Sequence, residues 1–243
     1  MHFFTPRTAS ITFIFAALPA IALAAEPACQ VRTGDRITPV IELYTSEGCS
    51  SCPPADQWLS TLKGQPVVAQ AFHVSYWNYI GWVDRFASPS HTTRQRQIAA
   101  RNNLPNIYTP QIVRNGKDWR DTTRALTAST EPARANITLQ STSEAHQFEA
   151  RISPAQDVGH WTAYWTVTEH GHSSRVSAGE NKGENLKHDF VVRQYTPVGN
   201  YEGAQTLKFS AIASNPQHPR QINLVITEPK SAKTLQAASL SCG

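Results

Sequence analysis

The strongest constraint on the fold is an alternation of apolar and polar side chains in the second half of the chain. Residues 161–168 read Trp-Thr-Ala-Tyr-Trp-Thr-Val-Thr, in which every odd position is apolar. A period of two places alternate side chains on opposite faces of a β-strand. Similar runs occupy residues 148–152, 207–211 and 222–226, with turn-forming residues between them. This spacing predicts a β-rich, antiparallel, sandwich-like region from about residue 131 onward.

The first half of the chain has a different pattern of apolar residues. Residues 39–44 and 67–74 are apolar runs of strand length, whereas residues 55–62 and 92–101 have the spacing of helices. Strands that alternate with helices are typical of α/β structure. We therefore expect an α/β region that ends near residue 130.

The composition is that of a globular protein without a nucleic-acid site. Of the 243 residues, 40% are hydrophobic and 16% are charged, and the formal net charge is only +4. No dense stripe of lysine and arginine occurs, and the aromatic residues are not interleaved with basic ones. We therefore expect no nucleic-acid partner.

The N-terminal segment has the pattern of an export signal. Arg7 precedes an apolar run over residues 11–23, which is shorter than the about 20 apolar residues of a membrane-spanning helix. Residues 22–25 end in the Ala-x-Ala pattern of a cleavage site. Residues 1–25 are therefore predicted to be a secretory signal peptide. The mature chain should lack a stable membrane span and be periplasmic or secreted.

The four cysteines of an exported chain are available for disulfides. Cys29 is near the predicted mature N-terminus and Cys242 is next to the last residue, whereas Cys49 and Cys52 form a Cys-x-x-Cys motif. Three pairings are possible, and the positions favour a structural Cys29–Cys242 bridge with a local Cys49–Cys52 pair. A structural zinc site needs four ligands, and no second Cys-x-x-Cys motif occurs, so the motif is not expected to bind structural zinc.

The Cys-x-x-Cys motif follows a predicted strand and precedes Pro53-Pro54 at a predicted helix start. Unpaired backbone N–H groups at such a helix end would stabilise a thiolate. We therefore expect Cys49 to be the nucleophile and Cys52 to be the resolving thiol that releases a mixed disulfide. A purely structural disulfide remains the alternative.

A second motif, Thr109-Pro110, stands at the head of a predicted strand after a helix. The order strand, Cys-x-x-Cys helix, strand, helix and Thr-Pro strand resembles the thioredoxin fold. The resemblance implies that Pro110 is a cis-proline packed against the cysteine pair. It also implies that the backbone of Thr109 pairs with an extended substrate.

Four strings of the sequence are similar to those of the DUF1223 family of exported bacterial proteins, whose function is unknown. They are residues 41–56, 72–82, 108–111 and 179–183. One departure is Ser75, where the family pattern suggests an aspartate. The resemblance implies an α/β thioredoxin-like domain followed by a β-rich domain.

The domain limits that follow are 26–130 and 131–243. The leading hypothesis is a thiol–disulfide oxidoreductase that acts on protein or small-molecule thiols and disulfides and needs no cofactor. Two alternatives stay open. One is a Cu(I)-binding or delivery protein that uses Cys49 and Cys52 with His73 as a further ligand. The other is a non-catalytic binding module whose disulfides are structural.

Charged residues near the motif could assist exchange. Glu42 precedes the cysteine pair by seven residues, and a partly buried carboxylate there could act as a base for the resolving thiol through a water. The alternative is an edge-strand glutamate that faces solvent. Arg94, Arg96 and Arg101 are expected on the solvated face of their helix.

The histidines give no metal signature. His73 is expected to be a strand-end histidine held by a hydrogen bond, and His188 and the turn at residues 179–183 are expected to be architectural. The three histidines between residues 160 and 172 lack the spacing of metal ligands. No metal site is therefore expected.

Overall fold

An eight-stranded mixed sheet forms the centre of the computed structural model, which describes residues 1–3, 29–121 and 129–242. Most of the predicted signal peptide lies outside the described residues. The sheet order is β14-β13-β8-β11-β3-β2-β4-β5. β3 runs parallel to β2 and to β11, and the other neighbours are antiparallel. The strands are β2 (Val40–Thr45), β3 (Val68–His73), β4 (Gln111–Arg114), β5 (Lys117–Asp118), β8 (His160–Glu169), β11 (Val191–Glu202), β13 (Arg220–Thr227) and β14 (Thr234–Leu240).

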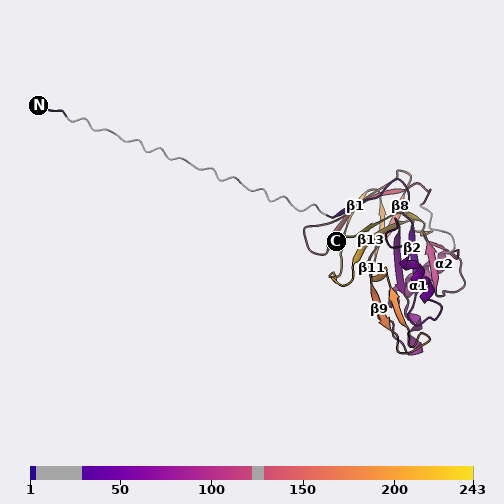
Figure 1. Cartoon of the computed structure of the whole chain (residues 1–243). Coiled ribbons are helices and arrows are strands. Elements are labelled where there is room, and N and C mark those ends of the chain that lie inside the picture. The colour runs from indigo at the N-terminus through magenta and orange to yellow at the C-terminus, as the bar shows by residue number, and fades with distance from the viewer. Residues whose placement is uncertain (4–28, 122–128, 243) are drawn as a thin grey trace.

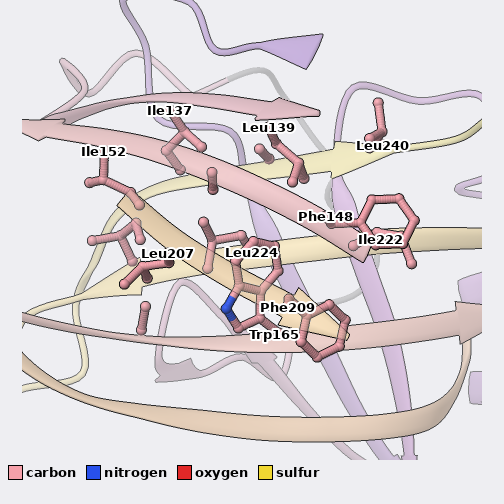
Figure 2. Close-up of a cluster of buried hydrophobic side chains, with 14 of the residues drawn as sticks. Ile137, Leu139, Phe148, Ile152, Trp165, Leu207, Phe209, Ile222, Leu224 and Leu240 are labelled. Atoms are coloured by element: carbon pink, nitrogen blue, oxygen red, sulfur yellow. The ribbon is translucent and has the colours of Figure 1, made fainter. Parts of the chain in front are cut away.

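A second, four-stranded antiparallel sheet packs against β8, β13 and β14. Its strands, in spatial order, are β1 (Gln30–Arg32), β6 (Ala135–Ser141), β7 (Gln147–Pro154) and β12 (Gln205–Ser210). Figure 2 shows the side chains of the two sheets pointing toward one another. Trp165 and Phe209 stack across this core with ring centroids 4.9 Å apart. The period-two alternation of the sequence thus supplies one apolar face to each sheet.

Two α-helices cover opposite faces of β2 and lie beside it in Figure 1. Leu59 of α1 (Pro53–Ser60) packs with Leu43, whereas Ile98 of α2 (Pro89–Arg101) packs with the next residue, Tyr44. Successive strand residues point to opposite faces, so the helices lie on opposite sides. The remaining elements are the 3₁₀-helix η1 (Ser75–Ile80) and the hairpin of β9 (His172–Arg175) and β10 (Asn185–His188).

The start of α2 follows directly from its sequence. Ser88 has extended backbone angles, and its hydroxyl accepts a hydrogen bond from the Ser90 N–H. Pro89 occupies the first helical position, where a missing N–H costs nothing.

The expected fold class, an α/β thioredoxin-like domain followed by a separate β-rich region, is wrong. The described chain is mostly strand, and its largest sheet joins strands from both halves of the sequence. All residues of β2 and β3 are buried, so β3 needs a neighbouring strand on each side. β11 supplies the second neighbour, with Val191 opposite Ala71. The domain limits at 26–130 and 131–243 stay a prediction.

The Cys29–Cys242 disulfide joins the two ends of the described chain. Cys29 directly precedes β1 and Cys242 follows β14, with Cα atoms 5.8 Å apart. The predicted pairing is confirmed. Among the described residues, no helix has both the length and the apolar character to cross a membrane.

A buried ion pair joins β2 to α2. Arg94 donates to both carboxylate oxygens of Glu42, at 2.6 and 2.9 Å. The hydroxyls of Tyr44 and Tyr164 also donate to Glu42, at 2.6 and 3.0 Å. Burial raises the pKa of Glu42, but the Arg94 charge and these hydrogen bonds outweigh it and hold the pKa below its usual value.

This ion pair corrects two expectations. Glu42 is only 3% exposed and lies in a strand with neighbours on both sides, so it does not face solvent from a sheet edge. Arg94 is buried because it neutralises Glu42, and only Arg96 and Arg101 are exposed as predicted.

Replacement of Arg94 should destabilise the protein strongly. The Arg94→Met substitution leaves the Glu42 carboxylate buried without its countercharge, which costs about 3–5 kcal/mol of unfolding free energy. Urea unfolding followed by tryptophan fluorescence measures the loss. Arg96→Met, an exposed site on the same helix, is the matched control and should change the free energy by less than about 0.5 kcal/mol. Equal losses in both variants would contradict the argument.

Candidate functional site

The cysteine pair lies in the turn between β2 and α1. Cys49 and Cys52 form a disulfide with Cα atoms 5.4 Å apart, and Cys52 is the N-cap of α1. Both cysteines are buried, at 1% and 0% exposure, whereas Ser50 and Ser51 between them are exposed. The surface of the motif is therefore the Ser-Ser dipeptide rather than the sulfur atoms.

The helix start does not offer free N–H groups to a thiolate, and that expectation is wrong. The first two residues of α1 are prolines, which have no N–H. The next two N–H groups, of Ala55 and Asp56, both donate to the carbonyl of Cys52. The Ser51 hydroxyl is within hydrogen-bond reach of the Cys49 sulfur, with its oxygen 3.4 Å from Sγ.

The Thr109–Pro110 peptide bond is cis, the geometry that the resemblance implied. The indole N–H of Trp77 donates to the Thr109 hydroxyl at 2.7 Å. Pro110 lines a cavity of about 380 Å³ together with Ser51 of the cysteine turn. Aromatic side chains form much of its wall, namely Trp58, Tyr108 and Trp119. The cavity thus brings both sequence motifs to one surface.

A turn from the second half of the chain holds the cysteine turn in place. The side-chain amide of Asn181, itself 6% exposed, donates to the carbonyl oxygens of Glu47 and Cys49 at 2.8 and 3.0 Å. The Glu180 carboxylate accepts hydrogen bonds from the backbone N–H and the hydroxyl of Ser50 at 3.0 and 2.7 Å. Four hydrogen bonds therefore tie residues 179–183 to the motif.

A buried cluster of acids and histidines lies beside the cysteine turn, at the ends of β2 and β3. We call it the acid–histidine cluster. Its members are at most 6% exposed. They are Glu47, Asp56, His73, Asp84 and His188.

Two further residues orient this cluster. The Thr45 hydroxyl donates to Oδ2 of Asp56 at 2.7 Å, and the indole N–H of Trp82 donates to Oε2 of Glu47 at 2.8 Å. Asp84 accepts from the backbone N–H of Glu47 at 2.9 Å and lies 2.7 Å from Nδ1 of His73.

The charges of the cluster are strongly coupled. Burial raises the pKa of Asp84, but His73 and two backbone N–H donors outweigh it and bring the pKa to about 2. Asp84 is therefore ionised at neutral pH, and Nδ1 of His73 must be the donor in their hydrogen bond. Burial lowers the pKa of His188, but the carboxylates of Asp56 and Glu47 outweigh it and raise the pKa to about 9.

His188 contacts these carboxylates without directed hydrogen bonds. Its Nε2 lies 3.3 Å from Oε1 of Glu47 and its Nδ1 lies 3.6 Å from Oδ1 of Asp56. Neither nitrogen has hydrogen-bond geometry, nor does Nε2 of His73. The attraction is therefore one of charge, and three imidazole nitrogens are left without a directed partner.

The sequence comparison decides the family. The profile described as "Protein of unknown function (DUF1223)" matches residues 40–227. The chain belongs to the DUF1223 family. This confirms the predicted membership of the DUF1223 family.

Two solved structures resemble this DUF1223 chain in fold. A crystal structure of a protein from Agrobacterium tumefaciens is 23% identical, covers 86% of this chain and 96% of its own, and has a TM-score of 0.67. HBP35 of Porphyromonas gingivalis is 12% identical, with 86% and 76% coverage and a TM-score of 0.61. No match was found among curated proteins.

The structure places the predicted site residues of the DUF1223 chain in two locations. Ser51, which stands between the two cysteines, and Pro110 line the same aromatic cavity. Glu42 lies with Arg94 on the face of the sheet that α2 covers, whereas the cysteines precede α1 on the other face. The structure therefore does not bring Glu42 to the sulfur atoms.

Sequence reasoning missed the acid–histidine cluster as a unit. Its members come from distant segments that no local pattern joins, and no motif predicts Asp84 or a contact between His188 and the cysteine turn. The two strings that resemble DUF1223 at residues 72–82 and 179–183 contain His73 and Asn181. They were the available sequence signal that these segments contribute to the site.

Loss of the Asn181 amide should make the disulfide easier to reduce. The Asn181→Ala substitution removes the side-chain donor of the Glu47 carbonyl and leaves the Cys49 carbonyl with the Cys52 N–H, which costs about 1–3 kcal/mol. If reduction requires local opening, its rate should rise by roughly 5-fold to 100-fold. Timed reduction with a phosphine, alkylation and mass spectrometry measure this rate. Lys182→Ala, an exposed neighbour, should leave it unchanged, and equal rates in both variants would contradict the role of Asn181.

Proposed function

We propose that this DUF1223 protein is an exported thiol–disulfide oxidoreductase that reacts through Cys49 and Cys52. The observation that carries the proposal is the shared cavity. Ser51, which stands between the cysteines, and Pro110 line the same aromatic surface. A substrate segment on that surface would lie against Ser51, within the cysteine turn, and aromatic walls suit an apolar side chain next to the substrate cysteine.

The oxidised pair would accept two electrons from a substrate dithiol. A substrate thiolate attacks Sγ of Cys49, the Cys49–Cys52 bond breaks, and Cys52 leaves as a thiolate. The second substrate thiolate then attacks the substrate sulfur of the mixed disulfide and displaces Cys49 as a thiolate. The products are a substrate disulfide and the reduced cysteine pair, which takes up protons according to its pKa values. The reverse sequence reduces a substrate disulfide.

Access to sulfur is the step that the protein must control. Both cysteines are almost completely buried, so a substrate cannot reach Cys49 until the turn that contains it opens. The hydrogen bonds from Asn181 and to Glu180 hold that turn closed. Substrate that docks in the aromatic cavity would reach Cys49 once these contacts open, so binding would precede exchange.

The environment of Cys49 supports a moderately stabilised thiolate. The Ser51 hydroxyl is placed to donate to the sulfur after the disulfide opens. Glu47, which would oppose a thiolate by like charge, points into the acid–histidine cluster and is compensated there by His188. The thiolate therefore does not face an uncompensated carboxylate.

We also propose that the protein works in the periplasm or outside the cell. Two disulfides persist most readily in an oxidising compartment, and the N-terminal pattern of an export signal supports the same location. Protein or small-molecule thiols and disulfides would be its partners. Binding of Cu(I) stays a hypothesis, and it applies only to the protein in which Cys49 and Cys52 are reduced.

Removal of the resolving thiol should trap a covalent intermediate. In Cys52→Ser, the free Cys49 thiolate attacks glutathione disulfide, and no neighbouring thiol releases the resulting mixed disulfide. Mass spectrometry of the intact protein should show one glutathione adduct that dithiothreitol removes. Cys49→Ser is the matched control and should form at least about tenfold less adduct, because the proposal assigns the attacking thiolate to Cys49, whose sulfur lies beside the Ser51 hydroxyl. No adduct on Cys52→Ser would favour the binding module with structural disulfides.

The reduction potential of the pair separates exchange from a structural role. We expect Cys49–Cys52 to be reduced above about −300 mV, the value below which structural disulfides of secreted proteins fall. Equilibration with dithiothreitol buffers, followed by alkylation and peptide mass spectrometry, gives the potential. Cys29–Cys242 is the internal comparison and should remain oxidised at the potential that reduces Cys49–Cys52. A potential for Cys49–Cys52 equal to or below that of Cys29–Cys242 would contradict the proposal.

A further inference from the structure

We propose that Asp56, His73 and His188 bind a divalent zinc ion beside the cysteine turn. Each of the three side chains presents one ligand atom, and these atoms lie within 4.8 Å of one another. Such spacing allows one ion to bind all three with bonds of about 2.0–2.2 Å after small side-chain rotations. The site contains no cysteine, so zinc binding can be tested independently of thiol exchange.

The unpartnered Nε2 of His73 is the independent evidence for a ligand. His73 is fully buried, yet its Nε2 has no hydrogen-bond partner. His188, at 3% exposure, contacts Glu47 and Asp56 as ion pairs at 3.3 and 3.6 Å. Buried polar atoms without partners are costly and uncommon in folded proteins. Zn²⁺ would accept the lone pair of His73 Nε2 and displace one ring proton of His188, which binds metal as the neutral imidazole.

The surroundings orient the ligands as in known metal sites. Asp84 accepts the Nδ1 hydrogen of His73, so that Nε2 keeps its lone pair and points away from Asp84. Thr45 donates to Oδ2 of Asp56 and leaves Oδ1 on the side of His188. Metal-binding histidines and carboxylates are usually held by such second contacts, which fix the ring and the lone pair.

The donor set selects the metal. Two imidazole nitrogens and one carboxylate oxygen suit Zn²⁺, whereas Ca²⁺ and Mg²⁺ prefer sites made of oxygen and Cu(I) prefers sulfur. Glu47 lies next to His188 through an oxygen that has no hydrogen-bond donor and could complete a four-coordinate site. The three carboxylates of this cluster carry negative charge, and a divalent cation would balance part of it.

The cluster is connected to the surface. A cavity of about 700 Å³ is lined by Asp56, His188 and Ser50 of the cysteine turn. An ion could therefore enter without unfolding of the sheet. The same cavity places a bound cation close to the turn that must open for exchange.

The test is a zinc titration of the whole folded protein after treatment with a chelator. Competition with a chromophoric chelator should give one equivalent of Zn²⁺ with a Kd below about 1 µM. His188→Gln and Asp56→Asn each remove a ligand and should weaken binding at least about 100-fold. Circular dichroism checks that each variant is folded. Equal affinity of wild type and His188→Gln would overturn the site.

Thr45→Val keeps all three ligands and tests the site if a ligand variant does not fold. It removes the hydrogen bond to Asp56 and should weaken Zn²⁺ binding roughly 10-fold to 100-fold. His172→Gln, which replaces a buried histidine outside the cluster, should leave the affinity unchanged. Unchanged affinity in Thr45→Val, or a loss in His172→Gln as large as in His188→Gln, would overturn the assignment.

Two further measurements separate this site from one made by sulfur. The Cys49→Ser/Cys52→Ser double variant should bind Zn²⁺ as the wild type does. Co²⁺ in place of Zn²⁺ should give visible bands of a nitrogen and oxygen site without a thiolate charge-transfer band. Loss of binding in the double variant, or a thiolate band, would overturn the site, and neither result depends on whether Cys49 exchanges disulfides.

Discussion

The complete burial of β2 and β3 is the constraint on which the rest of the structure depends. Every residue of both strands is buried, so both faces and both edges must be covered. α1 and α2 cover the faces, and β4 and β11 pair with the outer edges. The second half of the chain thereby becomes part of the sheet that carries the cysteine turn, rather than a separate layer beside it.

This arrangement also determines where polar chemistry can occur. β2 and β3 run parallel and therefore end at the same edge of the sheet. The cysteine turn follows β2, His73 ends β3, and Asp56 lies in the first turn of α1, four residues after Cys52. Both proposed sites therefore lie at this end of the sheet. The 179–183 turn and His188, contributed by the β9–β10 region, close it from the other side.

Much of the local structure could be predicted from the sequence. Strands at residues 161–168 and 222–226, the helices that begin near Pro53 and Pro89, and the Cys29–Cys242 pairing follow from alternation, capping and position. The candidate site could be predicted only in part, because the cysteines and Thr109-Pro110 are recognisable as motifs. The burial of Glu42 with Arg94 could not be predicted from the sequence, because this countercharge lies 52 residues away along the chain.

The sequence by itself determined most of the elements, the family and the cysteines for which we propose disulfide exchange. These properties depend on short-range spacing, which the chain carries regardless of how its elements assemble. Only the tertiary structure decided that β11 pairs with β3, that Asn181 closes the cysteine turn, and that Asp56, His73 and His188 converge. The physical reason is that these contacts join segments far apart in sequence, and burial in the folded protein, not local propensity, brings them together.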